Sequence, residues 1–354
     1  MALLEEIELA CIQSRAEEIM KAIGYIQPTD ANFSAGLQVF ELPAPAIGPL
    51  DLLVKIKAVS VNPVDYKVRS SRAGSRDMPV ILGWDAAGVV VATGDDVRDF
   101  RVGDEVFYAG DLTRQGSNAE LQAVDHRLVS NKPKSLTFAE AAALPLTSLT
   151  AYEMLFEQLR VPKNEPFDLL VIGGAGGVGS IAIQLIKALT QEGRVFATSG
   201  SDASNNWLRD IGVSGVIDRR RPLAKGMEAF GLKEFDYIFS TTHTADYIAQ
   251  LPDILRPFGG FGLIDDPQTL DIVPFKRKAA VIAWEFMFAK SMFGFHPETQ
   301  GKILGILADL IDRKKIKTTA NTILKGLTVE NVQEAHRRLA SHTSIGKIVI
   351  SIEE

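Results

Sequence analysis

The stretch DLLVIGGAGGVGSIAIQLIK at residues 168–187 decides the fold. An apolar run at 169–172 precedes five glycines within the seven positions 173–179, and a helical pattern follows at once. A strand that passes through a glycine-rich turn directly into a helix is typical of the first βα unit of a parallel sheet. We therefore predict a strand at 169–172 and a helix at 180–189.

The glycines of this turn have separable tasks. Gly174 permits a tight turn, Gly176 lets the backbone approach a pyrophosphate, and Gly179 lets the helix pack against the strand. The helix N-terminus supplies amide donors to the anion. We predict that these glycines, with Gly177 and Val178 between them, bind a dinucleotide. The alternative is a glycine-rich strand–helix corner without a ligand.

Strands and helices continue to alternate after this unit. Further strands are predicted at 195–198, 216–217, 237–240 and 261–264, with a helix at 206–211. Such a βαβαβ order implies a parallel sheet that is covered by helices on both faces.

The end of the second predicted strand, RVFATSG at 194–200, distinguishes between the two nicotinamide cofactors. An acid at this place would bond the ribose 2′-hydroxyl, but the strand ends in Thr198 and Ser199, and Asp202 comes too late. Hydroxyl groups leave room for a 2′-phosphate, and Arg219 supplies the counter-charge in this reading. The alternative is that Arg219 is a solvated loop residue. We predict NADPH as the cofactor.

The first third of the chain is strand-rich, whereas the end returns to helices. Strands are predicted at 52–61, 86–92 and 103–107. Thr137 and Glu140 form a capping box that predicts a helix over 139–144. Helices at 303–311 and 332–339 and a strand at 347–352 follow at the end, where composition alone does not assign the chain to either half.

Composition excludes several classes of protein. The 354 residues carry 38 Lys and Arg against 44 Asp and Glu, so no broad basic face for nucleic acid is expected. The single cysteine, Cys11, excludes an internal disulfide and a Cys-rich zinc site. No apolar stretch approaches the roughly 20 residues that span a membrane. We expect a cytoplasmic protein that acts on a small molecule.

Residues 1–19 contain five glutamates and lack the basic start of a secretory signal. Their apolar positions fall on one helical face, which predicts a short amphipathic helix before the first domain. A misassigned start codon is the alternative explanation.

Several motifs together resemble the quinone oxidoreductase and zeta-crystallin branch of the medium-chain dehydrogenase/reductase superfamily. Within that branch the chain is similar to the zinc-type alcohol dehydrogenase-like proteins, and the resemblance extends from Met20 to the end. The motifs are GGVG at 176–179 with Gln184 and Lys187, VNPVD at 61–65, GWDAAGV at 83–89, GDEV at 103–106 and GKIV at 346–349.

This resemblance implies an α/β architecture of two domains. A GroES-like, mostly β domain would comprise residues 20–145 and 291–354. A Rossmann domain with a doubly wound parallel sheet would comprise 146–290. The family implies an active site in the cleft between the domains and a homodimer joined through edge strands. The segment AAVIAWEFMF at 279–288 would be that edge, or else simply core.

The chain departs from the family at the metal. Where zinc alcohol dehydrogenases carry a cysteine, a histidine and a second cysteine, the matching positions are Asn62, Trp84 and Thr147. An amide, an indole and a hydroxyl do not form such a zinc site, so we predict no zinc. Without a Lewis acid, acceptors whose reduced form delocalises charge are favoured, such as quinones and α,β-unsaturated carbonyls.

The resemblance places four candidate residues near the reaction. Asn62 would donate to the carbonyl oxygen, Asp65 would orient its neighbours, Tyr66 would donate a hydrogen bond or a proton, and Thr147 would lie near the nicotinamide. Asn62 is alternatively a turn residue, and Tyr66 a wall residue. Competing functions are an enoyl-thioester reductase and an NADPH-binding protein with a structural or regulatory role. A zinc alcohol dehydrogenase is the least favoured.

Overall fold

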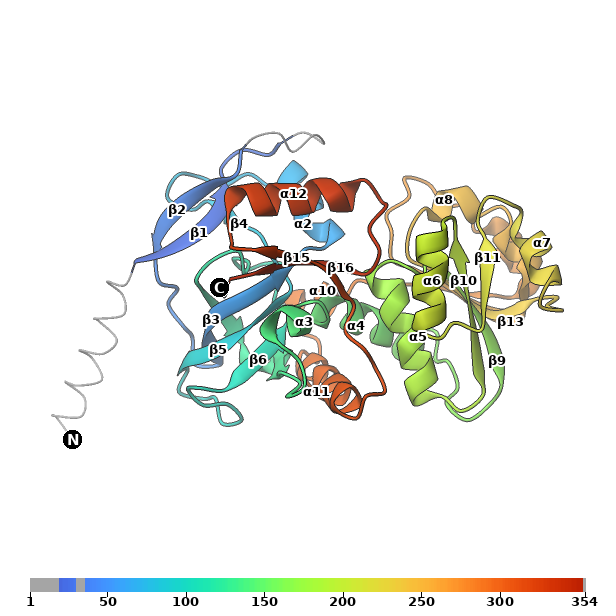
Figure 1. Ribbon diagram of the computed structural model, residues 1–354, viewed down its shortest axis with the longest axis horizontal. Helices are drawn as coiled ribbons and strands as arrows, with labels where there is room; N and C mark the ends of the chain where they lie inside the picture. The colour runs from blue at the N-terminus through green and yellow to red at the C-terminus, as the bar shows by residue number, and fades with distance from the viewer. Residues whose placement is uncertain (1–18, 30–35, 353–354) are drawn as a thin grey trace. The chain divides into compact units, whose positions relative to one another are not determined.

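The computed structural model describes residues 19–29 and 36–352 (Figure 1). The helix expected before the first domain, at 1–19, therefore lies outside the described residues except for Ile19, which begins a strand. The described chain forms two compact units: 19–29, 36–146, 288–308 and 320–352 make the first, and 147–287 with 309–319 make the second. The domain boundaries implied by the resemblance stay a prediction.

A mixed sheet dominates the first unit. Its strand order is β15-β16-β3-β5-β6-β8, with β7 also paired to β3. The C-terminal strand β16 pairs in parallel with β15 and antiparallel with β3, so the end of the chain completes the N-terminal sheet. These strands are β3 (Asp51–Ser60), β5 (Ala86–Thr93), β6 (Glu105–Tyr108), β7 (Leu121–Asp125), β8 (Val129–Asn131), β15 (Ala320–Lys325) and β16 (Lys347–Ser351).

The strands predicted at 52–61, 86–92, 103–107 and 347–352 are confirmed as β3, β5, β6 and β16. A smaller antiparallel sheet of β1 (Ile19–Tyr25), β2 (Gln38–Pro43) and β4 (Val80–Ile81) was not predicted. Its β1 strand packs through Met20 and Ala22 against Leu53 of β3 and Ala92 of β5. The two sheets of this unit thus share an apolar layer.

Helices accompany these sheets in the described part of the chain, and the capping box predicted for one of them is confirmed. The Thr137 N–H donates to Glu140 Oε2 at 2.9 Å, and the Glu140 N–H donates to Thr137 Oγ1 at 3.3 Å. The helices are α2 (Pro63–Ser71), α3 (Phe138–Ala142), α10 (Phe288–Met292), α11 (Glu298–Asp312), whose last turn belongs to the second unit, and α12 (Val329–Ala340). A 3₁₀ turn, η1 (His126–Leu128), joins β7 to β8.

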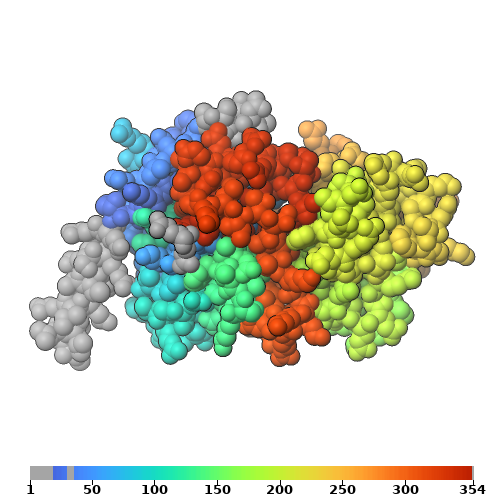
Figure 2. Space-filling model, viewed as in Figure 1, coloured from blue at the N-terminus to red at the C-terminus, as the bar shows by residue number. Residues whose placement is uncertain are grey.

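Helix α12 packs on α2 through a buried polar pair. Arg69 Nη1 lies 3.3 Å from His336 Nδ1, and both side chains are fully buried. Burial, with the charge of Arg69, lowers the pKa of His336 to about 3. The imidazole is therefore neutral near pH 7, as befits a packing residue. The opposite face of α12 is at the surface, in red at the top of Figure 2.

The second unit is built on a six-stranded parallel sheet. Its order is β11-β10-β9-β12-β13-β14, and every adjacent pair is parallel. The strands are β9 (Phe167–Ile172), β10 (Gly193–Ser199), β11 (Gly215–Asp218), β12 (Phe235–Ser240), β13 (Leu255–Leu263) and β14 (Val281–Trp284). This confirms the predicted parallel α/β sheet and places part of the 279–288 segment at its edge.

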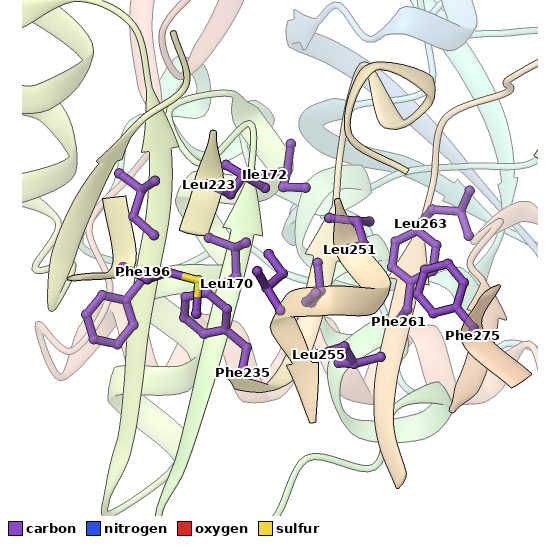
Figure 3. Close-up of a cluster of buried hydrophobic side chains, with 14 residues drawn as sticks. Leu170, Ile172, Phe196, Leu223, Phe235, Leu251, Leu255, Phe261, Leu263 and Phe275 are labelled. Atoms are coloured by element: carbon purple, nitrogen blue, oxygen red, sulfur yellow. The ribbon is translucent and has the colours of Figure 1, made fainter. Parts of the chain in front are cut away.

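Helices connect these strands, and apolar side chains fill the space between them and the sheet. Figure 3 shows one such cluster, in which the rings of Phe261 and Phe275 stack with centroids 5.3 Å apart. The helical elements are α4 (Pro145–Tyr152), whose first two residues belong to the first unit, the π-helix η2 (Glu153–Gln158), α5 (Gly177–Leu189), α6 (Asp202–Asp210), α7 (Leu223–Glu228), α8 (Thr244–Tyr247), α9 (Leu251–Ile254) and the 3₁₀ helix η3 (Val273–Lys278). None of the helices at 19–29 and 36–352 has the length and apolar character needed to cross a bilayer.

Candidate functional site

The glycine turn lies where β9 passes into α5. Gly173 has φ +80°, and its carbonyl accepts the Gly176 N–H at 3.1 Å. Gly176 is the N-cap of α5, so the first amide groups of the helix have no helical carbonyl to bond. The tight turn was predicted to depend on Gly174, but the left-handed residue is Gly173.

The space around each glycine shows whether the fold itself excludes a side chain there. A Cβ on Gly174 would lie 2.6 Å from Ala197 Cβ, and one on Gly179 would lie 2.6 Å from Gly173 O. A Cβ on Gly176 would meet nothing closer than Gly173 O at 3.4 Å, which is ordinary contact. The fold thus requires Gly174 and Gly179 but leaves room at Gly176. This cradle fits the pyrophosphate of a dinucleotide.

Hydroxyl groups and one arginine gather at the adjacent strand end. The Gly173 N–H donates to Thr198 Oγ1 at 3.1 Å, which ties β10 to the glycine turn. The Arg219 N–H donates to the Ser199 carbonyl at 2.8 Å. A Cβ on Gly200 would lie 2.4 Å from Arg219 Nε, so the arginine side chain runs along this strand end. Thr198, Ser199 and Arg219 are therefore brought together beside the turn.

Acidic groups at this strand end are engaged elsewhere or lie farther along. Asp218 accepts from Arg220 Nε at 2.8 Å and from Arg220 Nη2 at 3.0 Å. Asp202 is exposed in the first turn of α6, after Ser201, whose Oγ accepts the Ser204 N–H. The end of β10 itself therefore presents hydroxyl groups rather than a carboxylate.

A third loop, which was not predicted from the sequence, lies at this edge of the sheet. Thr241 follows β12, and its hydroxyl donates to the Ile172 carbonyl at 2.9 Å. A Cβ on Gly173 would lie 2.5 Å from Thr241 Oγ1 and 2.7 Å from Thr242 Cγ2. The available signal was the pair of hydroxyl residues directly after a buried strand, since parallel strands end at one edge.

In the first unit, Asn62 and Asp65 lie together at the start of α2. The Asn62 N–H donates to Asp65 Oδ2 at 2.6 Å, and the Gly83 N–H donates to Asp65 Oδ1 at 3.0 Å. The Asn62 amide group donates to Asp85 Oδ2 at 2.8 Å and accepts from Lys347 Nζ at 2.5 Å. Both ends of the amide are thus held within this unit.

Burial dominates the electrostatics of this network. It raises the pKa of Asp65 to about 7, against the opposing effects of the amide donors and Lys347. It also raises the pKa of Asp85 and lowers that of Lys347, while the 3.1 Å ion pair between these two groups opposes both shifts. Nearly complete removal from water therefore makes each charge in the network dependent on its neighbours.

The other predicted catalytic residues lie on two helices. Tyr66 is partly buried on α2, and Thr147 is buried on α4 in the second unit. The catalytic roles of Asn62, Asp65, Tyr66 and Thr147 stay predictions. For Asn62 and Asp65 the observed bonds describe a fixed internal network.

The residues at the positions of the family's metal ligands do not fit a zinc site. Trp84 is buried, donates from Nε1 to the Asp111 carbonyl at 3.1 Å and packs edge-on against Phe288. The oxygen of the Asn62 amide faces an ammonium group. Within 19–29 and 36–352, His, Cys, Asp and Glu side chains nowhere gather in threes that could hold a metal ion.

Comparison with known proteins identifies the relatives of this chain. Residues 48–149 match the alcohol dehydrogenase GroES-like domain, and residues 211–350 match the zinc-binding dehydrogenase domain. A zinc-type alcohol dehydrogenase-like protein of Staphylococcus epidermidis is 34% identical over 94% of this chain and 100% of its own length. The predicted resemblance is confirmed.

Two further relatives differ in what their names describe. A Rhizobium etli protein of known crystal structure, described as a zinc-dependent alcohol dehydrogenase, is 46% identical in sequence. The two structures align with a TM-score of 0.90 over 94% of this chain and 98% of the other. A 2-methylene-furan-3-one reductase of Solanum lycopersicum is 43% identical over 49% of this chain and 46% of its own length.

Two glycine substitutions separate cofactor binding from folding. Gly176→Ala should leave the melting temperature nearly unchanged, because its Cβ meets only ordinary contact, but should weaken NADPH binding by roughly tenfold or more. Gly179→Ala should instead lower the melting temperature, because its Cβ would collide with backbone atoms. Calorimetric titration with NADPH and thermal unfolding measure the two effects. Unchanged NADPH affinity in Gly176→Ala would contradict pyrophosphate binding at Gly176.

Proposed function

The chain belongs to the medium-chain dehydrogenase/reductase superfamily, and we propose a function for it on that basis. It is a cytoplasmic oxidoreductase that uses NADPH to reduce a quinone or an α,β-unsaturated carbonyl without zinc. The observation that carries the proposal is the amide of Asn62, which is fixed between a carboxylate and an ammonium where the family places a metal ligand.

The second unit provides the elements of an NADPH site. When bound, NADPH supplies a hydride. The Gly176 cradle leaves room for the pyrophosphate, and the free amide groups at the start of α5 donate to it. Arg219, lying along the end of β10, neutralises the 2′-phosphate that distinguishes NADPH from NADH.

The donor set of the first unit favours acceptors that need no Lewis acid. Reduction of an isolated ketone forms an alkoxide, which needs a metal or a strong proton donor. Reduction of a quinone or enone forms a phenolate or enolate, whose charge is delocalised, so positioning and modest hydrogen bonding suffice. The name of the Solanum lycopersicum relative describes such an acceptor, a ketone conjugated to a methylene group. The names of other relatives favour a zinc alcohol dehydrogenase as the second candidate.

The proposal also includes a homodimer joined through β14. This strand ends the parallel sheet, and its Val281 and Trp284 are 55% and 51% exposed. An exposed apolar edge strand presents backbone donors and acceptors to a matching strand, and two-fold symmetry lets a second copy supply it.

Chelator-treated protein should oxidise NADPH in the presence of 9,10-phenanthrenequinone, 1,4-benzoquinone or an enal, with absorbance at 340 nm as the measurement. It should turn over NADPH in preference to NADH and should be inactive toward simple ketones, because nothing in its donor set stabilises an alkoxide. Loss of turnover on chelation, with recovery on adding zinc, would favour the alcohol dehydrogenase. Tight NADPH binding without turnover of any acceptor would favour a binding role.

Charge reversal at Arg219 should change cofactor preference. Arg219→Glu should weaken NADPH binding by about tenfold or more, equivalent to at least roughly 1.4 kcal/mol, and should affect NADH little. Arg220→Glu is the matched control, since Arg220 pairs with Asp218 rather than lying along Gly200. Fluorescence titration of both cofactors measures the ratio. An equal loss in both variants would show a general charge effect instead of a phosphate contact.

A charge on the edge strand should disrupt the dimer. Trp284→Lys should shift the protein to monomer in light scattering after size exclusion, because a charged side chain blocks edge-to-edge pairing. Phe258→Lys, at a 75% exposed phenylalanine of the same unit, should leave the dimer intact. A wild-type protein that is already monomeric would refute this assembly.

A further inference from the structure

Three oxygen atoms in the first unit surround one buried ammonium group. Lys347 Nζ donates to the Val61 carbonyl at 2.7 Å and to Asn62 Oδ1 at 2.5 Å, and it forms an ion pair with Asp85 Oδ2 at 3.1 Å. Lys347 begins β16 and is only 4% exposed. An ammonium group has three donors and no acceptor, so these three oxygens satisfy it completely.

We call the three oxygens of Val61, Asn62 and Asp85 around Lys347 Nζ the cage. They come from separate parts of the chain. Val61 and Asn62 link β3 to α2, whereas Asp85 directly precedes β5. Asp85 also accepts the Leu146 N–H at 2.8 Å and the Asn62 amide at 2.8 Å. Removal of the ammonium would therefore leave the Asn62 amide oxygen without this donor and the buried Asp85 carboxylate with only neutral donors.

A second carboxyl group lies beside these oxygens. Asp65 is fully buried and accepts two backbone N–H groups, one from Asn62 and one from Gly83. The titratable groups around the three oxygens are thus Asp65, Asp85 and Lys347, and Lys347 is the basic member of this set. The surroundings are arranged for a cation.

We propose that this cage is a cation site whose resident cation is the Lys347 ammonium, and that a free primary ammonium ion enters it when the lysine side chain is truncated. Lys347 is then a positioning residue, which fixes the amide of Asn62 and the carboxylate of Asp85. This site differs from a zinc site in its ligands. Its three oxygens lie at hydrogen-bonding or ion-pair distances from Lys347 Nζ, whereas protein zinc sites are built mainly from cysteine and histidine. Only the activity measurement below rests on the proposed function.

Another lysine of the first unit provides a matched control. Lys132 is 8% exposed, and its Nζ donates to the Pro133 carbonyl at 3.1 Å and to the Leu136 carbonyl at 2.5 Å. It also pairs with Glu105 at 3.1 Å, but that carboxylate is 54% exposed. Lys132 is thus equally buried, whereas its ionic partner keeps contact with water.

The experiment measures thermal unfolding of Lys347→Ala without cofactor. The variant should melt roughly 10 °C below the wild type, because a buried carboxylate loses its partner. Methylammonium chloride should restore part of this loss with a saturable dependence on concentration. Tetramethylammonium and sodium chloride at equal ionic strength should not, since neither presents N–H donors. Lys132→Ala should show no difference between the three salts.

A double variant keeps the test informative if Lys347→Ala does not fold. Lys347→Met retains the apolar stem, and adding Asp85→Asn removes the uncompensated carboxylate. The double variant should melt higher than Lys347→Met alone. In the oxidoreductase assay Lys347→Met should lower kcat with little change in the KM for NADPH, and Lys347→Arg should restore part of kcat. Lys132→Met should leave kcat unchanged.

Two results would overturn the cation site. One is an identical response of Lys347→Ala to methylammonium and tetramethylammonium. The other is a Lys347→Met variant with the melting temperature of the wild type, which would show that the charge of the ammonium does not contribute to stability. Both results are obtained without cofactor or acceptor, so they are independent of whether NADPH reduction itself is observed.

Discussion

The close approach of α5 to the end of β9 is the constraint on which the second unit depends. No side chain fits at Gly174 or Gly179, because backbone atoms and Ala197 already occupy the space. This contact fixes the start of α5, and with it the amide groups that would bind the pyrophosphate in the proposed function. Thr198 and Thr241 then tie the neighbouring strand ends to the same turn. A cofactor site therefore follows from packing as much as from ligand chemistry.

The first unit poses a different problem, which is how to stabilise titratable groups that are removed from water. Asn62, at the position of a family metal ligand, lies between Asp85 and Lys347. Such a network costs desolvation and is stable only when every member is bonded. Trp84 fills the second ligand position with a packed indole. In the proposed function this unit contributes hydrogen bonds, which suit acceptors whose reduced form delocalises its charge.

Periodicity and turn chemistry predicted most of the parallel sheet and several elements of the first unit, because buried strands and capped helices depend on local sequence. The capping box at Thr137 and the strand at 169–172 are examples. The β1-β2-β4 sheet was missed, since β2 has mostly exposed or half-buried positions and no buried run. The role of Lys347 could not be predicted either. Its partners are 262 or more residues away in sequence, and only pairing of β16 with β3 brings them together. Long-range contacts of this kind leave no local pattern.

The most direct test of zinc-independent hydride transfer is the position of deuterium after one turnover of an enal with 4-deuterated NADPH. Mass spectrometry of the product and of the protein's metal content should be done on the same sample. Zinc-independent reduction of the enal predicts deuterium on the β-carbon, from one face of the nicotinamide, in protein that holds far less than one zinc ion per chain. Deuterium on the carbonyl carbon, or transfer only in zinc-loaded protein, would contradict it.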